Sequence, residues 1–345
     1  MITKQDIVNL IFKNNKVYQE LDKTKLKLNL LNKKSSAYAP SNIALCKYWG
    51  KRNIELNLPV TSSLSLSLGN KGATTSVGLY VGDNEQDKVI LNNEEVNFNS
   101  VFYIRLKKFL DLFRLDNNFY FKIDTKLNIP YAAGLASSAC GFAALVLALN
   151  KFFGWNLSLK DLSILARLGS GSAARSLQQG FIYWNKGENE DGSDSYAEKI
   201  DSDFTDVMFG LIILTDKQKS IGSTEAMNIT KDTSVLYKSW PYQVKQDMEL
   251  IRQAIQNKDF NLLGKSAENN ALAMHATMQS SIPAIYYANA DTVNLMHKVW
   301  KLRADGLDVY FTQDAGPNIK LLFHKKDKEI IQAEFNNVEI VNPYQ

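Results

Sequence analysis

The sequence PYAAGLASSACGFAALVLAL at residues 130–149 joins a loop of small residues to an apolar run long enough for a helix. Ser137 and Ser138 stand where that helix would begin, so their hydroxyls can cap its unpaired backbone N–H groups. Those N–H groups and the helix dipole attract phosphate, and the small side chains let phosphates approach the backbone. The stretch therefore predicts a nucleotide-phosphate loop, although a tight turn into a buried helix would explain the loop alone equally well.

Length and composition place the chain among ordinary globular proteins. At 345 residues it exceeds the usual size of one domain, so we expect two domains that share an interface. Hydrophobic residues make up 45% and charged residues 22% of the chain, and the net charge is only +4. So small a charge predicts no nucleic-acid partner, although it suits an anionic small substrate if cations converge locally.

Cysteine and histidine usage argues against a disulfide framework or a zinc site. Cys46 and Cys140 are the only cysteines, and neither they nor the three histidines have the spacing of metal ligands. No apolar run reaches the ~20 residues of a membrane span, and the N-terminus lacks the pattern of a signal peptide. We therefore expect a protein of the reducing cytoplasm that does not enter a membrane.

Hydrophobic periodicity predicts the order of the elements. Residues 1–34 form an appendage that packs on the rest or contacts another subunit, with loose helical spacing first and a short strand at 26–30. Strict alternation in TSSLSLSL predicts a half-buried strand at 61–68. Further helices are expected at 101–113, 157–168, 241–257, 260–278 and 289–303, and further strands at 207–215, 307–313 and 319–323.

Two segments place charged residues at turns. Lys47 and Lys51 flank Tyr48-Trp49-Gly50, and they either point at one anion or form a solvated pair. Asp314 follows the strand predicted at 307–313 and opens the turn Asp-Ala-Gly-Pro-Asn. An aspartate in this position is usually a turn former, but it is also where a sheet would hold a general base facing a cleft.

The segment GSGSAAR at 169–175 loosely matches a dinucleotide-binding fingerprint. That fingerprint must follow a strand, whereas the preceding residues have helical periodicity, which excludes a Rossmann site. Ser170, Ser172 and Arg175 are instead candidates for a second anion cradle, because a guanidinium offers paired donors. The alternative is a surface arginine with no ligand.

Taken together, these segments resemble the mevalonate diphosphate decarboxylases of the GHMP kinase superfamily. The pattern PxxxGLxSSA indicates only the superfamily, whereas KYWGK, SGSAxR and DAGPN point to the decarboxylase branch. The matching segments occur in the order of the family and cover the chain from about residue 37 to the end. They are APSNIALCKYWGKRN (39–53), LPVTSSLSLSL (58–68), PYAAGLASSACGFAAL (130–145), SGSAAR (170–175), GSTEAM (222–227), MHATM (274–278) and DAGPN (314–318).

The resemblance implies an α+β, GHMP-kinase-like fold of two domains. After an N-terminal extension at 1–36, it implies a ribosomal-protein-S5-like, ATP-binding domain at 37–206 and a ferredoxin-like domain at 207–345. The implied reaction is ATP-dependent decarboxylation of mevalonate 5-diphosphate to isopentenyl diphosphate, with release of ADP, phosphate and CO2. ATP and Mg2+ are the implied cofactors, and homodimers are common in the family.

By similarity, the motifs also supply roles. Asp314 matches the aspartate that acts on the C3 hydroxyl during phosphoryl transfer, Lys47 an active-site lysine that neutralises charge, and Arg175 the arginine at the substrate carboxylate. The residues implied for the ATP phosphates are Ala133, Gly134, Leu135, Ala136, Ser137 and Ser138. Those implied for the substrate are Tyr48, Lys51, Ser170, Gly171, Ser172, Arg175, Ser223 and Met227, with Tyr48 and Lys51 at the diphosphate. The metal ligands stay open.

The chain departs from the family pattern at Thr224, where some bacterial members place arginine, so diphosphate binding would rest more on Lys51. The nearest rival function is a GHMP-type kinase or decarboxylase that acts on mevalonate or mevalonate 5-phosphate. The joint presence of Lys47, Arg175 and Asp314 argues against a kinase. A catalytically inactive paralogue would have lost the base or the loop serines, and the sequence retains both.

Overall fold

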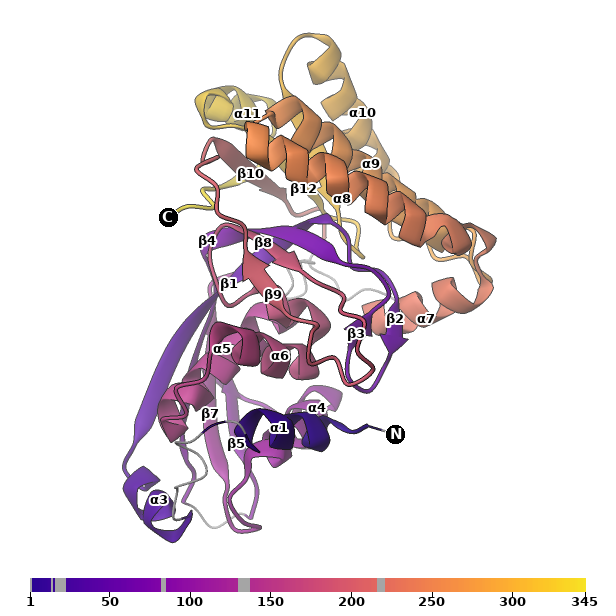
Figure 1. Ribbon diagram of the computed structural model, residues 1–345. Helices are drawn as coiled ribbons and strands as arrows, with labels where there is room; N and C mark the ends of the chain where they lie inside the picture. The colour runs from indigo at the N-terminus through magenta and orange to yellow at the C-terminus, as the bar shows by residue number, and fades with distance from the viewer. Residues whose placement is uncertain (1, 14, 16–22, 82–84, 130–136, 216–220) are drawn as a thin grey trace.

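Two β-sheets organise the molecule (Figure 1). The computed structural model describes residues 2–13, 15, 23–81, 85–129, 137–215 and 221–345. Within them, the larger sheet has seven strands in the order β6-β5-β7-β4-β8-β9, with β1 paired to β4 off this path. The sheet is mixed because β5 and β7 are parallel. Its strands are β1 (Lys34–Cys46), β4 (Ser63–Leu79), β5 (Lys88–Leu91), β6 (Glu94–Glu95), β7 (Phe121–Leu127), β8 (Phe181–Trp184) and β9 (Ala197–Lys199).

The second half of the chain forms a separate antiparallel sheet. In the described residues it has four strands in the order β11-β12-β10-β13. The strands predicted at 61–68, 207–215, 307–313 and 319–323 are confirmed, and β4 continues beyond its prediction to Leu79. The half-buried character predicted for 61–68 is wrong, because both faces of β4 are buried from Ser63 to Leu68. The strands of this sheet are β10 (Val207–Ile212), β11 (Val309–Gln313), β12 (Ile319–His324) and β13 (Glu339–Val341), and a separate hairpin pairs β2 (Lys51–Asn53) with β3 (Leu58–Pro59).

Helix α5 (Ser137–Phe153) forms the centre of the first half. It is apolar around most of its circumference and packs across β1 and β4, as expected for a helix enclosed by the core. The helices predicted at 101–113, 157–168, 241–257, 260–278 and 289–303 are confirmed, and the 3-10 helix η1 (Asp111–Phe113) completes the first of them. These helices are α4 (Val101–Leu110), α6 (Leu159–Gly169), α8 (Trp240–Asn257), α9 (Phe260–Gln279) and α10 (Ala290–Ala304), and the described residues add α7 (Ser223–Thr233) and α11 (Lys328–Glu334).

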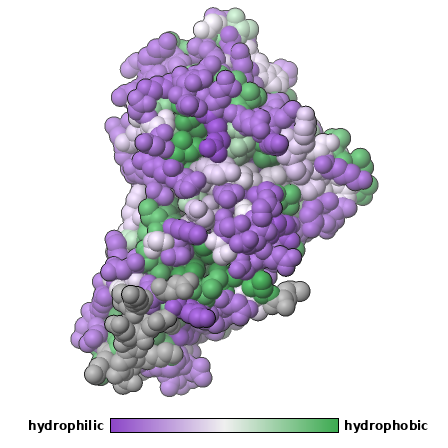
Figure 2. Space-filling model, in the orientation of Figure 1, coloured by the Kyte–Doolittle hydropathy of each residue, from purple (hydrophilic) through white to green (hydrophobic). Residues whose placement is uncertain are grey.

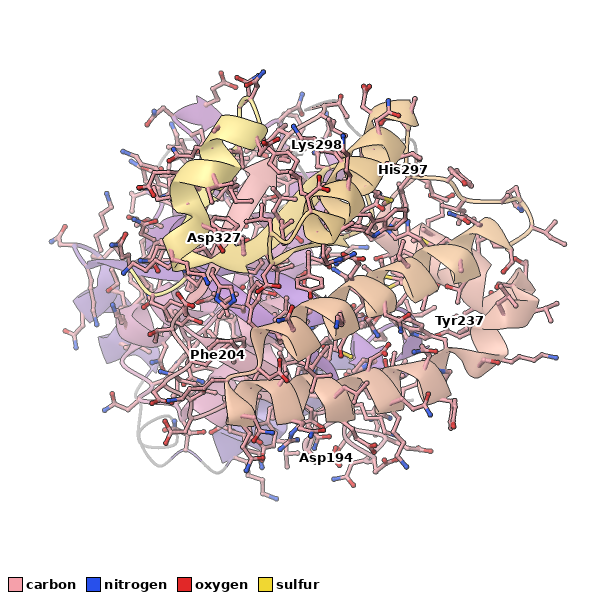
Figure 3. The ribbon with its side chains drawn as sticks, turned by 90° about the horizontal axis from the view of Figure 1, so that it is seen from above. Asp194, Phe204, Tyr237, His297, Lys298 and Asp327 are labelled. Atoms are coloured by element: carbon pink, nitrogen blue, oxygen red, sulfur yellow. The ribbon has the colours of Figure 1, made fainter. Side chains whose placement is uncertain are left out.

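The long helices α8 and α9 lie against both sheets, α9 through β11 of the second and α8 through β1 and β4 of the first. They pack against each other, and the view from above in Figure 3 shows them running side by side. Helix α9 also contacts β11 and the end of β1, so that it lies between the two sheets. Asp259 caps α9 by accepting a hydrogen bond from the backbone N–H of Leu262. This helix is therefore fixed where side chains from both halves can meet it.

The N-terminal segment packs on the first half of the molecule. Helix α1 (Lys4–Lys13) buries Ile7, Val8, Ile11 and Phe12. The ring of Phe12 meets that of Trp155 with their centroids 4.8 Å apart. A packing role, one of the two alternatives predicted for residues 1–34, is therefore confirmed for α1.

The short strand predicted at 26–30 is wrong, because these residues belong to the helix α3 (Lys23–Leu30). Leu26 and Leu30 are buried, whereas Leu28 is 64% exposed. Residues four apart share one face of a helix, and in a strand all three leucines would share one face. The alternation of leucines therefore indicated the period of two of a strand, whereas the segment has the period of a helix.

The C-terminal residues connect the two halves. The hydroxyl of Ser67 on β4 donates to the carbonyl of Pro343 over 3.4 Å. The hydroxyl of Tyr344 donates to the carbonyl of Phe204, just before β10, over 2.7 Å.

The face drawn in Figure 2 is mainly hydrophilic over its upper part, with smaller hydrophobic areas below. Every helix in the described ranges is too short or too polar to cross a lipid bilayer.

Candidate active site

A cavity of about 480 Å3 is lined by residues from both halves of the chain. Every predicted site residue that the structure describes lines this cavity, so the motifs meet at one place. Their roles stay predictions. Ala133, Gly134, Leu135 and Ala136 of the predicted phosphate loop lie outside the described residues. The predicted residues in the lining are Lys47, Tyr48, Lys51, Ser137, Ser138, Ser170, Gly171, Ser172, Arg175, Ser223, Met227 and Asp314.

Asp314 is held at the end of β11 by two buried lysines. Its Oδ1 lies 2.8 Å from Lys47 Nζ, and its Oδ2 lies 3.3 Å from Lys320 Nζ on β12. Burial alone would raise the pKa of the Asp314 carboxyl, but the charges and hydrogen bonds of Lys47 and Lys320 outweigh burial and hold it far below its usual range. The carboxylate is therefore ionised and fixed by both oxygens.

Helix α9 supports both members of the Asp314–Lys47 pair through their backbones. The N–H of Lys47 donates to Asn270 Oδ1 over 2.7 Å, and the Asn270 amide in turn donates to the buried Asp247 on α8 over 2.8 Å. Further along α9, His275 Nε2 lies 3.2 Å from the carbonyl of Asp314 and donates to it. Burial, with the charge of Lys47, lowers the pKa of His275 to about 4, so the ring is neutral.

Arg175 is a buried cation without a carboxylate within ion-pairing distance in the described part of the chain. It ends the 3-10 helix η2 (Gly171–Arg175). Its guanidinium donates to the Ser63 hydroxyl and, over 3.4 Å, to Asn42 Oδ1. Burial lowers its pKa to about 10, against the influence of Asp314. A buried, positively charged fork facing a cavity suits a carboxylate ligand.

The loop between Lys47 and Lys51 is fixed at its middle by the second half of the chain. The carbonyl of Trp49 accepts hydrogen bonds from the hydroxyl of Tyr237 (Figure 3) over 3.1 Å and from the Trp240 indole over 3.0 Å. Gly50 has a φ of +107°, and a Cβ there would lie 1.7 Å from the Tyr237 hydroxyl. Only glycine fits this turn, which sets the separation of the two lysines.

Tyr48 and Lys51 both line the cavity. The Tyr48 hydroxyl is buried without a hydrogen-bond partner in the described residues, and a Cβ at Gly171 would lie 2.8 Å from it. Lys51 Nζ donates to Asn57 Oδ1 over 2.7 Å and to the Thr224 hydroxyl over 3.5 Å. Burial, followed by two nearby cations, lowers the Lys51 pKa to about 8. Both groups have hydrogen-bonding capacity for an anion.

Ser137 and Ser138 open helix α5 and line the cavity. The hydroxyl oxygens of Ser138 and Ser170 are 3.4 Å apart, so the start of α5 adjoins the start of η2. The unpaired N–H groups of a helix start bind phosphate well. The described residues contain no group of three His, Cys, Asp or Glu side chains that could hold a metal ion.

Two family models cover most of the chain. A diphosphomevalonate decarboxylase-like N-terminal domain matches residues 39–197, and a mevalonate 5-diphosphate decarboxylase C-terminal domain matches residues 210–341. The chain belongs to the mevalonate diphosphate decarboxylase family. The α+β, GHMP-kinase-like fold of two domains expected from the sequence is confirmed by the solved structures of this family.

Curated and solved decarboxylases are similar over most of their length. The diphosphomevalonate decarboxylase mvd1 of Aspergillus fumigatus is 36% identical, and the match covers 86% of this chain and 78% of that protein. The crystal structure of the Staphylococcus aureus mevalonate diphosphate decarboxylase is 36% identical with a TM-score of 0.83, covering 91% and 97% of the two chains. A structure of MDDEF in complex with MVAPP, AMPPCP and magnesium is 39% identical with a TM-score of 0.83, covering 90% and 96%.

The decarboxylase motifs did not predict four residues that meet this site. Lys320 and Asn270 contact the Asp314–Lys47 pair, and Arg105 on α4 lines the cavity. His275 lies inside the quoted motif MHATM, but no role followed from it. Each of the other three lies on a regular helix or strand with no local motif, so only the tertiary structure reveals them.

Proposed function

We propose that the chain catalyses the ATP-dependent decarboxylation of mevalonate 5-diphosphate to isopentenyl diphosphate, with release of ADP, phosphate and CO2. The supporting observation is the cavity in which the Asp314–Lys47 pair, the unpaired Arg175 and the start of α5 meet. A carboxylate for a hydroxyl, a guanidinium for a carboxylate and a helix start for phosphate are the groups that this reaction needs. The MDDEF structure with MVAPP, AMPPCP and magnesium supports the same ligands.

In this proposal Asp314 orients the C3 hydroxyl and accepts its proton as the hydroxyl oxygen attacks the γ-phosphorus of ATP and the bond to ADP breaks. Its low pKa makes it a weak base. Proton transfer is therefore favourable only once phosphorylation has made the hydroxyl acidic. Positioning and charge stabilisation carry most of such a transfer, and Lys47 supplies a positive charge beside the reacting oxygen.

Arg175 holds the substrate carboxylate during the second step. The C3 phosphate departs with its bonding electrons, the C–C bond to the carboxylate supplies the electrons of the new double bond, and CO2 leaves. The buried guanidinium replaces water around the carboxylate and fixes its orientation while the C–C bond breaks. Arg175 therefore binds the group that the reaction removes.

The nucleotide phosphates are assigned to the start of α5, through Ser137 and Ser138, and to the loop at 133–136. Mg2+ prefers oxygen ligands and commonly binds the phosphates together with water. It would neutralise charge on the transferring phosphoryl group. We assign no metal ligand among the protein residues.

A CO2-release assay tests the proposed function. Purified protein with ATP and Mg2+ should release CO2 and ADP in equal amounts from mevalonate 5-diphosphate, and far less from mevalonate or mevalonate 5-phosphate. All three substrates are assayed in parallel, with CO2 trapped and ADP measured by a coupled reaction. Release of ADP without CO2 would contradict the decarboxylase and favour a kinase. CO2 from the monophosphate alone would move the substrate to mevalonate 5-phosphate.

We also propose domain limits at 37–206 and 207–345, a cytoplasmic location and a homodimer. The limits accord with two separate sheets and with a change of sheet between Lys199 and Val207. Analytical ultracentrifugation across a range of concentrations tests the assembly. Sedimentation as a monomer throughout would contradict the dimer.

A further inference from the structure

Strand β8 places an indole ring behind the cavity. Its last residue, Trp184, is fully buried and does not line the cavity. The ring belongs to a small apolar cluster that is separate from the main hydrophobic core, and Tyr48 packs against this cluster. Its buried members are Ala174, Ile182, Trp184 and Ala197. Trp184 therefore lies directly behind residues that do line the cavity.

The register of the larger sheet brings Trp184 and Ser63 to Arg175 together. Trp184 on β8 is paired directly with Ser63 on β4. Directly paired residues of antiparallel strands present their side chains on the same face of the sheet. Arg175 donates a hydrogen bond to the Ser63 hydroxyl, and its guanidinium carbon lies over the Trp184 ring, 5.8 Å from the ring centroid. One cross-strand pair thus supplies both a hydrogen-bond acceptor and an aromatic face to the same guanidinium.

The partners of Arg175 stabilise its charge without neutralising it. The quadrupole of an aromatic ring attracts a cation over its face, most strongly for indole and more strongly when the cation is desolvated. In the described part of the chain, the side chains that accept hydrogen bonds from Arg175 are the neutral ones of Ser63 and Asn42. A carboxylate in their place would compensate the charge and compete with an anionic ligand. The indole therefore helps to keep a buried positive charge available at the cavity.

The same ring also contacts Tyr48. The centroids of the Tyr48 and Trp184 rings are 4.9 Å apart and their planes meet at 65°, the edge-to-face arrangement that aromatic pairs prefer. The indole N–H donates to the Ser195 hydroxyl over 3.2 Å, and this hydroxyl donates to the carbonyl of Asn185 over 3.1 Å. The indole is thus held in one orientation, and it fixes Tyr48 and Arg175 relative to each other.

We propose that Trp184 is a positioning residue for the substrate, which holds the Arg175 guanidinium toward the substrate carboxylate and Tyr48 beside it. The inference deepens the proposed function and rests on it, because the role of Arg175 at the carboxylate belongs to that function. Trp184 lies in none of the decarboxylase motifs and acts only through its neighbours. Small errors in the placement of a binding group are costly, so loss of the ring should weaken substrate binding and leave ATP binding unchanged.

Calorimetry of mevalonate 5-diphosphate binding, without nucleotide, tests the proposal with a graded pair of variants. We expect Trp184→Met, which removes the ring, to weaken binding about tenfold, and Trp184→Phe, whose ring attracts a cation less than indole does, about threefold. Trp184→Phe keeps an aromatic ring in the cluster, so it decides the matter even where Trp184→Met fails to fold. Unchanged affinity in Trp184→Phe would overturn the proposal.

Trp155→Met is the matched control. Trp155 is as deeply buried as Trp184, but its ring packs on Phe12, Phe113 and Phe153 and does not line the cavity. This variant should lose stability in urea and keep its affinity for mevalonate 5-diphosphate. An equal loss of affinity in Trp155→Met and Trp184→Met would show a general effect of core damage and overturn the positioning role.

A double-mutant cycle tests the route through Arg175. In the Arg175→Gln background, Trp184→Phe should change the affinity less than it does in the unmodified protein. An undiminished effect would overturn action through Arg175. In steady-state kinetics the KM for mevalonate 5-diphosphate should rise in Trp184→Phe while the KM for ATP stays constant, and an equal rise in both would overturn the assignment to the substrate. A chain that shows the expected affinities but releases no CO2 would contradict only the proposed function.

Discussion

At the scale of single residues, Asp314 is defined by its two lysines. Lys47 is expected to face the reaction, whereas Lys320 contacts the other carboxylate oxygen and does not line the cavity. Lys320 therefore acts through Asp314 as a positioning residue. The pair of contacts keeps the carboxylate from rotating, which matters because small errors in orientation cost rate.

We expect Lys320→Met to lower kcat by about tenfold, on the order of 1.4 kcal/mol in the barrier, with little change in the KM for the diphosphate. Asp314 keeps its ion pair with Lys47 in this variant, so the charge stays compensated and the protein folds. Steady-state kinetics measure the effect, with Asp314→Asn as the reference that should abolish turnover while ATP still binds. An unchanged kcat would show that Lys47 alone fixes the carboxylate.

At the scale of elements, α9 connects the segment that carries Lys47 to the segment that carries Asp314. Asn270 holds the backbone of Lys47 from the first half, and His275 holds the backbone of Asp314 from the second. Both contacts come from a single helix. Helix α9 therefore fixes the two backbone segments that carry Lys47 and Asp314 relative to each other.

His275 makes stability depend on pH. Its folded pKa of about 4 lies below the unfolded value near 6.5, so between these values the unfolded chain takes up a proton that the folded chain does not. Stability thus falls as the pH falls through ~6.5 toward about 4, whereas the contribution of Asp314, whose folded pKa is depressed, is lost only below ~4.

Urea unfolding at pH 7 and pH 5 measures this dependence. Between these values the unmodified protein should lose on the order of 2 kcal/mol more free energy of unfolding than His275→Gln. His297→Gln is the matched control, because His297 (Figure 3) is exposed. Equal losses in all three proteins would show that the His275 ring is protonated in the folded state.

The sequence predicted the site residues that lie in short contiguous motifs. It missed the site residues that lie singly on a regular helix or strand. Asp314 and Arg175 lie in short segments whose other residues also line the cavity, so the motifs located them. Lys320 lies on a strand and Arg105 on a helix. In such elements a single lysine or arginine without a surrounding motif is expected to be a surface residue. The error at α3 has a different cause, because Leu26 and Leu30 fit a period of two and a spacing of four alike.

At the scale of the whole molecule, the site exists only when the two halves are docked. Lys47 and Arg175 come from the half with the larger sheet, and Asp314 comes from the other. The C-terminal residues strengthen this docking through Tyr344, whose hydroxyl bonds to the carbonyl of Phe204. Burial raises the pKa of Tyr344 well above its usual range, so the hydroxyl keeps its proton and donates.

We expect Tyr344→Phe to lower the free energy of unfolding by about 1 kcal/mol and to leave kcat unchanged. The substitution removes one hydrogen bond and keeps the packed ring. Urea unfolding and steady-state kinetics measure the two quantities. Tyr286→Phe is the control, because the Tyr286 side chain is 65% exposed. A fall in kcat without a loss of stability would mean that Tyr344 influences the active site rather than the docking of the two halves.

The carbonyl of Trp49 sets a rule for making chimeras from these enzymes. It accepts hydrogen bonds from Tyr237 and Trp240, which a later part of the chain contributes. Consider a hybrid that joins the N-terminal half of this chain to the C-terminal half of a relative. The loop at 47–51 fits in such a hybrid only if the relative supplies both hydrogen-bond donors and if Gly50 is kept, because the Tyr237 hydroxyl occupies the space beside it. Residues 47–51 and 237–240 therefore form one unit of recombination, although they lie far apart along the chain.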